Sequence, residues 1–258
     1  MDKPLDFSPE ETNRKLREQY TEIARLAGGL AHEVKNPLST IRLNMDLLAE
    51  EMDELPDSPR KNRGVKRIET VRRETVRLEE LLNEFLNFTR AHCLELLAAD
   101  VNGELREIID FFRPQAERLG VEIVEYFAAD LPTIRLDKRS FHRAILNLLI
   151  NAAQAIPDGG QIVVRTRHHG NEVAIDLIDS GCGMEEETIQ KMFEPFYSTK
   201  IEGTGLGLPT VRKIIAGHGG RIAIQSEPGR GTQFTLTFPA LPRLGAEEKP
   251  NPIPLPPS

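Results

Sequence analysis

The sequence predicts an α+β protein with two parts, a helical hairpin that forms a dimeric four-helix bundle and, after it, an α/β sandwich. Three observations predict this class. Before residue 90, apolar residues recur at alternating steps of three and four, as in helices that pack at a shallow angle. After residue 94, helical patterns alternate with short strand patterns. The length of 258 residues suits two modest domains better than one.

Two long helices are expected in the first part. The turn Pro56-Asp57-Ser58-Pro59 separates two apolar stripes. A single hairpin has too little partner surface to bury both stripes, so we expect a homodimer. The first stripe consists of Val34, Leu38, Ile41, Met45, Leu48, Met52 and Leu55, and it extends upstream through Ile23, Leu26 and Leu30. The second stripe consists of Ile68, Val71, Thr75, Leu78, Leu82 and Phe85.

The second part begins with a capped helix. Asn102 is expected to cap a helix that ends before Gly120, and Asp137 to start a helix that ends at about Ile156. Because helices and paired strands follow one another in this order, we expect helices to cover one face of a sheet. The expected strands are residues 121–127, 162–166, 173–178, 221–226 and 232–238, and the later helices are 188–193 and 206–216.

The composition excludes several classes of protein. The net charge of −7 argues against a nucleic-acid partner, which selects a basic surface. No apolar run approaches the roughly 20 residues of a membrane span, and the N-terminus lacks the apolar core of a signal peptide. Cys93 and Cys182 form neither a metal motif nor a disulfide framework, so a cytoplasmic localisation is expected.

His32 is the candidate nucleophile. On its expected helix it lies away from the stripe that contains Leu30 and Val34, so solvent can reach it. Glu33 can hold the imidazole in one tautomer and accept its proton. Asn36, one turn later, shares the face of His32 and can orient a phosphate or a water. The alternative is an ordinary surface histidine beside a salt-bridging neighbour.

A second group of polar residues has the chemistry of a nucleotide site. Asn147 and Asn151 lie one helical turn apart, and their amide oxygens suit Mg²⁺; alternatively, they are two polar residues within the core. Asp179 ends an apolar strand and can accept a hydrogen bond from an adenine amino group. Gly181 and Gly183 then let the backbone approach the base, although a plain turn has the same pattern.

A third group precedes the expected helix at residues 206–216. The free N–H groups of Gly203, Gly205 and Gly207, with Thr204 and Leu206 between them, predict an anion site. Lys200 lies just upstream and can reach phosphates, and residues 198–204 are expected to act as a lid.

Together these residues resemble the kinase core of the two-component sensor histidine kinases. Residues 32–37, 147–153, 179–183, 193–196 and 203–207 are similar to the H, N, G1, F and G2 boxes of that family, in the family's order. The run Phe-Tyr-Ser-Thr-Lys before the last box is similar to the nitrogen-regulation-like branch.

The resemblance implies a fold, a reaction and partners. The second part would have the Bergerat-type ATP-binding fold. ATP with Mg²⁺ would phosphorylate His32, with Glu33 as base, and an aspartate in the receiver domain of a response regulator would then take the phosphoryl group. Asn36 would support a phosphatase activity. The implied metal ligands are Asn147 and Asn151, and the implied nucleotide contacts are Asn151, Asp179, Gly181, Gly183, Lys200, Gly203, Thr204, Gly205, Leu206 and Gly207.

Two departures from the family pattern affect this interpretation. Many relatives carry a basic residue where this chain has Gln154, so either Lys200 or a nearby arginine is expected to supply that charge. Residues 1–21 are too few for a sensor domain, so the input signal is expected from an upstream sensor protein or from a longer chain.

The expected domain limits are a helical lead-in at 1–20, a dimerisation and phosphotransfer domain at 21–93, a catalytic ATP-binding domain at 94–240 and a disordered proline-rich tail at 241–258.

Two other classes of function compete. The first is an ATPase that does not phosphorylate itself, as in chaperones and mismatch-repair proteins with the same ATP fold. Those proteins typically place a catalytic glutamate one turn before the Mg²⁺-binding asparagine, where this chain has Asn147, which disfavours that class. The second is a dimeric scaffold with a degenerate nucleotide site, against which the intact boxes argue.

Overall fold

The computed structural model describes residues 34–89, 94–200 and 203–241, and these residues divide into two compact units. The first unit contains the described residues up to 89 together with Lys191–Thr210, and the second contains Leu94–Gln190 and the described residues from Val211 onward. The predicted lead-in at 1–20 and the tail after residue 241 lie outside the described residues.

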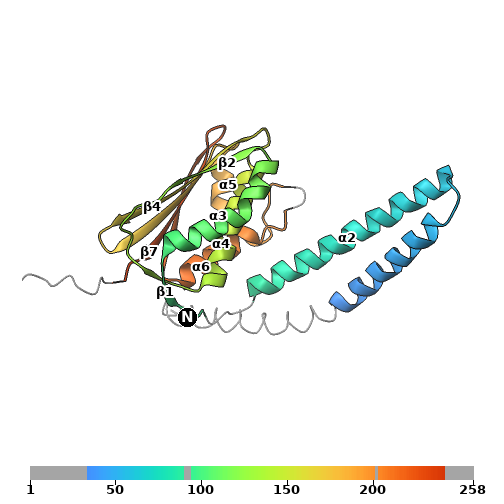
Figure 1. Ribbon diagram of the computed structural model, residues 1–258, viewed down its shortest axis with the longest axis horizontal. Coiled ribbons are helices and arrows are strands. Elements are labelled where there is room, and N and C mark those ends of the chain that lie inside the picture. Colours follow the sequence, from blue (N-terminus) through green and yellow to red (C-terminus); the bar gives the residue numbers. More distant parts are fainter. Residues whose placement is uncertain (1–33, 90–93, 201–202, 242–258) are drawn as a thin grey trace, which may run out of the picture. The chain divides into compact units, whose positions relative to one another are not determined.

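A helical hairpin forms most of the first unit. A helix through residues 34–53 is followed by α2 (Pro59–Thr89), and the two run side by side (Figure 1). Pro59 is the first residue of α2, and the Ser58 hydroxyl accepts the Lys61 N–H at 3.1 Å, which caps the helix. The Lys61 ammonium donates to the Leu55 carbonyl at 2.7 Å and thereby caps the end of the preceding helix. The predicted turn is therefore confirmed.

The apolar stripes of the hairpin divide into two rows. Members that face the neighbouring helix, such as Leu38, Ile68 and Thr75, are buried. The other row remains 37% to 51% exposed in a single chain. We call this row the outer stripe; it consists of Val34, Ile41, Leu48, Leu55, Val71 and Leu78.

The second unit is built on a five-stranded sheet of order β2-β4-β5-β7-β6. Its first pair, β2 (Val121–Tyr126) and β4 (Gly160–His169), is parallel, and the remaining neighbours are antiparallel. The remaining strands of this sheet are β5 (Glu172–Asp179), β6 (Arg221–Glu227) and β7 (Gly231–Pro239). A separate small sheet pairs β1 (Leu97–Ala99) with β3 (Ile134–Leu136).

Three helices lie on one face of the five-stranded sheet: α3 (Val101–Arg118), α4 (Lys138–Gln154) and α6 (Gly207–Gly217) (Figure 1). The short helix α5 (Glu186–Lys191) follows β5 in the chain. The core between sheet and helices is apolar, and its buried side chains include Ile109, Phe112, Phe141, Leu149, Ile162, Ile175, Ile215 and Leu236. A helical hairpin followed by a mixed α/β sheet is the predicted α+β arrangement.

The start of α3 corrects one expectation. Asp100, not Asn102, caps the helix: its backbone is extended and its carboxylate accepts the Asn102 N–H at 3.0 Å. Asn102 instead lies inside α3, where its amide donates to the Ala128 carbonyl at 2.8 Å and accepts from the Thr166 hydroxyl at 2.9 Å. Its side chain therefore ties α3 to β4.

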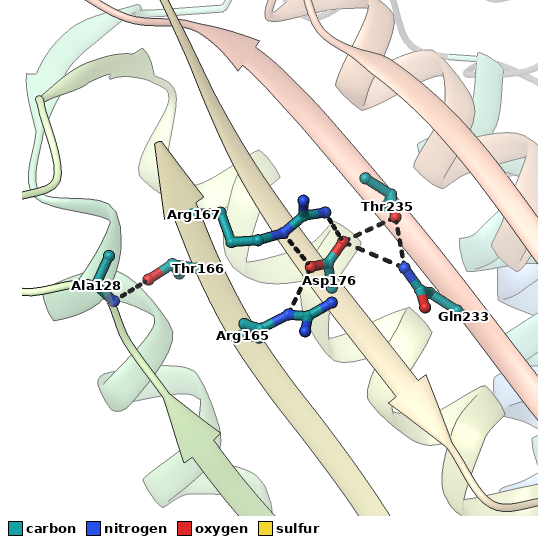
Figure 2. A network of polar contacts seen from close by, with 7 residues as sticks. All are labelled: Ala128, Arg165, Thr166, Arg167, Asp176, Gln233 and Thr235. Atoms are coloured by element: carbon teal, nitrogen blue, oxygen red, sulfur yellow. Dashed lines mark hydrogen bonds and ion pairs between the residues drawn. The ribbon is translucent and has the colours of Figure 1, made fainter. Parts of the chain in front are cut away.

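A buried carboxylate joins three strands on the other face of the sheet (Figure 2). Asp176 on β5 is paired in register with Arg165 on β4 and Thr235 on β7. Its carboxylate accepts hydrogen bonds from Arg167 at 2.7 and 2.8 Å, from Arg165 at 2.9 Å and from Thr235 at 2.8 Å. Burial alone would raise the pKa of Asp176, but these hydrogen bonds outweigh burial and hold the pKa below the ordinary aspartate range.

We expect Asp176→Asn to lower the free energy of opening of β5 by about 2 kcal/mol. The loss should be smaller than for a fully buried pair because the side chains of Arg165 and Arg167 are 41% and 50% exposed and can be hydrated. Hydrogen exchange of the β5 amides measures this free energy. Because the folded-state pKa of Asp176 is depressed, its contribution is complete above pH ~4 and is lost as the pH falls through the folded-state pKa.

The matched control is Glu172→Gln on the same strand, which removes an exposed ion pair with Arg221. That variant should change the stability by less than about 0.5 kcal/mol. Equal effects of the two substitutions, or an effect of Asp176→Asn that persists undiminished in acid, would contradict the assignment.

Candidate functional site

The predicted metal ligands Asn147 and Asn151 lie on α4 in the second unit. Asp137 caps this helix, with its carboxylate 2.8 Å from the Ser140 N–H. Leu148, Leu149, Ala152 and Ala153 are the buried residues around the two asparagines. Asn147 and Asn151 are half-buried and Gln154 is exposed, so the three share one face of α4 that is not sealed in the core.

Asp179 lies at the end of β5 and is buried. Its Oδ1 atom accepts the Gly181 N–H at 2.9 Å and the Thr232 N–H at 3.2 Å. One hydrogen bond comes from the loop that follows β5, and the other comes from the neighbouring strand β7. The carboxylate is therefore held in one orientation by the backbone on both sides of it.

The loop after β5 lies close to the end of α4 and to the turn between β6 and β7. The Cys182 N–H donates to the Ala155 carbonyl at 2.9 Å, and the Cys182 carbonyl accepts the Gly229 N–H at 2.7 Å. A Cβ atom at Gly181 would stand 2.6 Å from the Ala155 oxygen, and one at Gly183 would stand 2.0 Å from the Glu227 oxygen. Gly183 also has a φ of +66°.

These contacts explain why residues 181 and 183 are glycines, an explanation that the sequence alone does not provide. The sequence predicts that both glycines let the backbone approach a base. In the structure, the chain's own backbone already requires them, since any side chain would collide with a carbonyl oxygen. Their contribution to ligand binding stays a prediction.

The glycine-rich residues 203–207, which we call the phosphate segment, belong to the first unit. Its Gly205 carbonyl accepts the N–H of Phe196, a residue that precedes the segment, at 3.0 Å. Phe196 and Gly205 both have a φ of +68°, and a Cβ atom at Gly205 would stand 2.4 Å from the Phe196 carbonyl carbon. Gly203 similarly lies against the Ser198 hydroxyl, which also accepts the Lys200 N–H at 3.1 Å.

Gly207 differs from the other glycines of the phosphate segment. It is the first residue of α6, and a Cβ atom placed there would meet no described atom within 4 Å. The Leu206 N–H just before it donates to the Thr204 hydroxyl at 3.3 Å. The fold therefore does not require glycine at residue 207, whereas a ligand that approaches the backbone of a helix N-terminus would.

The predicted catalytic residues are only partly visible. His32 and Glu33 lie outside the described residues, and Asn36 is exposed on the first helix of the hairpin. Two further residues, both on α2, lie near the phosphate segment. Glu84 accepts a hydrogen bond from the Thr204 hydroxyl, and the Phe85 ring lies 6.4 Å from the Phe196 ring. Phe85 was assigned only to an apolar stripe, and nothing in the sequence marked Glu84.

Another cluster has metal-binding side chains but a different explanation. Glu104, Glu107 and His142 are grouped between α3 and α4. Glu104 already contacts Lys138 at 2.5 Å and His142 at 2.8 Å. Burial would raise the pKa of Glu104, but the hydrogen bonds from Lys138 and His142 outweigh it and hold the pKa low. This cluster is therefore an ion-pair network, and it does not include the predicted Mg²⁺ ligands.

Within the described ranges, no helix is both long and apolar enough to cross a membrane.

Two family descriptions match separate parts of the chain. The "His Kinase A (phospho-acceptor) domain" matches residues 22–94. The "Histidine kinase-, DNA gyrase B-, and HSP90-like ATPase" matches residues 136–242. The first match contains His32, and the second contains every predicted nucleotide contact.

The chain is also similar to individual proteins. It is 33% identical over 226 residues to the sensor histidine kinase ZraS of Escherichia coli (strain K12), a match that covers 87% of this chain and 47% of ZraS. It is 27% identical to full-length ShkA, solved in complex with AMPPNP, with a TM-score of 0.68 over 84% of this chain and 46% of that one. The histidine kinase ThkA, solved in complex with the response regulator protein TrrA, shares the fold, with 24% identity and a TM-score of 0.63 over 92% of this chain and 68% of that one. The chain spans between 32% and 48% of the length of the curated relatives that it matches.

The two kinds of glycine lead to a testable difference between Gly183 and Gly207. Gly183→Ala should lower the free energy of unfolding by at least about 2 kcal/mol, because the new methyl group is in a left-handed backbone and meets the Glu227 oxygen. Gly207→Ala should leave stability unchanged or raise it slightly, because alanine favours a helix and has open space there. Thermal unfolding compares the two variants.

Gly207→Ala should nevertheless weaken the binding of a nonhydrolysable ATP analogue at least tenfold, measured by titration calorimetry, because the methyl group would cover helix N–H groups. Full affinity in Gly207→Ala would show that the space around residue 207 is not used by the nucleotide.

Proposed function

Because this chain belongs to the two-component sensor histidine kinases, we propose that it transfers the γ-phosphoryl group of ATP to its own His32 and then to an aspartate of a response regulator. The observation that carries this proposal is the occurrence of a phospho-acceptor match at 22–94 and an ATPase match at 136–242 in one chain. The chemistry needs both, because the histidine is the acceptor and the second domain holds the donor.

In the proposed reaction, a ring nitrogen of His32 attacks the γ-phosphorus. A nitrogen–phosphorus bond forms as the bond to the β,γ-bridging oxygen breaks, and ADP leaves. Glu33, the next residue, accepts the proton from the imidazole. Asn36, exposed one turn later, orients a water for the reverse, phosphatase, activity toward the response regulator.

The residues of the proposed ATP-binding domain, 94–240, suit ATP with Mg²⁺. Asn147 and Asn151 supply neutral oxygen ligands on a half-buried face, and they leave the charge of the cation to be balanced by the phosphates. Asp179, whose carboxylate is held by two backbone N–H groups, accepts a hydrogen bond from the adenine amino group in the proposed complex. The phosphate segment, with its open Gly207, and Lys200 bind the phosphates. Gly181 and Gly183 shape the loop that carries the adenine contact.

The proposed assembly is a homodimer with a response regulator receiver domain as partner and an upstream sensor protein as input. The outer stripe supports the dimer, because a row of apolar side chains that recurs every seven residues along a hairpin is the surface that a second hairpin covers in a four-helix bundle. We retain the limits 1–20, 21–93, 94–240 and 241–258 for the lead-in, the phosphotransfer domain, the ATP-binding domain and the tail.

The dimer is tested by Leu78→Glu, which places a charge on the outer stripe. Leu78 is 51% exposed in a single chain, so the substitution should leave the hairpin folded but raise the dimer dissociation constant at least 100-fold. Size-exclusion chromatography with light scattering at micromolar concentration measures the mass. The matched control is Val76→Glu, which alters a residue that is 42% exposed on the same helix but off the stripe. A monomeric wild type, or equal dissociation in both variants, would contradict the dimer.

The kinase activity is tested with γ-labelled ATP and Mg²⁺ on the wild type and on His32→Gln. The wild type should acquire an acid-labile, base-stable label, because phosphohistidine has that stability, and the variant should acquire at least 100-fold less. A label that persists in His32→Gln would place the acceptor elsewhere. ADP release from the wild type without any protein label would instead support the ATPase class of function.

A further inference from the structure

We propose that Glu84 is an internal anion that occupies the phosphate segment and competes with the phosphates of ATP for it. The inference rests on the proposed function, since it concerns the regulation of the same nucleotide site. It assigns to α2 a direct influence on nucleotide affinity.

Two consecutive residues of α2 contact the segment that leads into α6. The Thr204 hydroxyl donates a hydrogen bond to Oε2 of Glu84. The neighbouring Phe85 ring lies 6.4 Å from the ring of Phe196 and is tilted by 30° to it, which is a favourable arrangement of aromatic rings. All four residues belong to the first unit. Two contacts therefore hold Glu84 at the phosphate segment: its own hydrogen bond with Thr204 and the neighbouring contact between the Phe85 and Phe196 rings.

Glu84 is linked to the N-terminus of α6 through a single hydroxyl group. The Leu206 N–H donates to the Thr204 oxygen at 3.3 Å, and the same hydroxyl donates its hydrogen to Glu84. The eleven-residue helix α6 begins at the next residue, Gly207, and a helix N-terminus attracts negative charge. In this structure the Glu84 carboxylate is joined to the residue before that N-terminus by the Thr204 hydroxyl.

Phosphate would need the same donors. The Thr204 hydroxyl has one hydrogen and cannot donate it to Glu84 and to a phosphate oxygen at once. A carboxylate held beside a triphosphate also repels it, because both are negative. Nucleotide binding through Thr204 therefore requires that Glu84 withdraw.

The contact of α2 with Thr204 and Phe196 can break at low energetic cost. The Phe196 side chain remains 65% exposed although it touches Phe85, so little apolar surface is buried there. Phe196 also has a φ of +68°, and it is the only described residue other than glycine with a positive φ. A bulky side chain in that backbone conformation is strained, so the chain at Phe196, just before the phosphate segment, is not at its local energy minimum.

The consequence is a coupling between the hairpin and the nucleotide. A movement of the last turns of α2 that withdraws Glu84 frees Thr204 and removes the repelling charge. Binding of ATP in turn favours the withdrawn position, because the two anions exclude each other.

The first experiment compares Glu84→Gln with the wild type in the full chain. Glutamine keeps the shape and the acceptor oxygen but removes the charge, so the dissociation constant for a nonhydrolysable ATP analogue with Mg²⁺ should fall at least threefold. The matched control is Glu80→Gln, which removes an exposed carboxylate one turn earlier on α2. Equal affinities of Glu84→Gln and Glu80→Gln, or weaker binding by Glu84→Gln, would overturn the proposal.

A double-mutant cycle tests whether Glu84 acts through Thr204. In a Thr204→Val background, which lacks the hydroxyl, Glu84→Gln should change the affinity by less than half of its effect in the wild type. An equal gain in both backgrounds would mean that Glu84 acts only as a distant charge, and the proposed contact would be wrong. Thermal unfolding of each variant verifies that affinity and not folding has changed.

The outcomes separate this inference from the proposed function. If neither the wild type nor any variant binds the analogue, the proposed function fails, and the inference fails with it. If the wild type binds and labels His32 while Glu84→Gln behaves like Glu80→Gln, only the inference fails.

Discussion

Asp179 accepts hydrogen bonds from backbone N–H groups of the loop that follows β5 and of β7, and the candidate site in the second unit depends on this link between the loop and the strand. The chain packs so closely there that a Cβ atom at Gly231 would stand 1.9 Å from the Asp179 carbonyl oxygen, and one at Gly181 would meet the end of α4. The helix that carries Asn147 and Asn151 is thereby fixed against the strand that carries Asp179. Backbone contact, with no side chain between, holds these residues in place.

Features that depend on nearby residues could be predicted from the sequence. Asp137 caps α4 as expected, and the turn at Pro56 to Pro59 ends one helix and starts the next. The strands β1 and β3 were missed because three residues are too few to show an alternation. The cap of α3 was assigned to Asn102 because Asp100 and Asn102 are both good caps, and only the extended backbone at Asp100 decides between them.

The candidate site was predictable as a set of residue types but not as a set of contacts. The glycines at 181, 183 and 207 look alike in the sequence, and only the surrounding atoms separate those that the fold requires from the one that it leaves open. The contact between Glu84 and Thr204 joins residues 120 positions apart, which no local pattern encodes. The hairpin shows the same limit: its stripes predicted burial, but the division into a covered and an uncovered row needed the pairing of the two helices.

Because there is open space around Gly207, the residue at that position reports whether a ligand is bound there. Substitution at residue 183 is opposed by the chain's own carbonyl group, whatever the protein does, so glycine there reports only that the fold is intact. At residue 207 no described atom of the chain opposes a side chain, and under the proposed function the bound nucleotide does. A descendant of this protein that had ceased to bind nucleotide would be free to change residue 207 while keeping residue 183. The residues at positions 183 and 207 would then distinguish a relative that binds nucleotide from one that keeps only the fold.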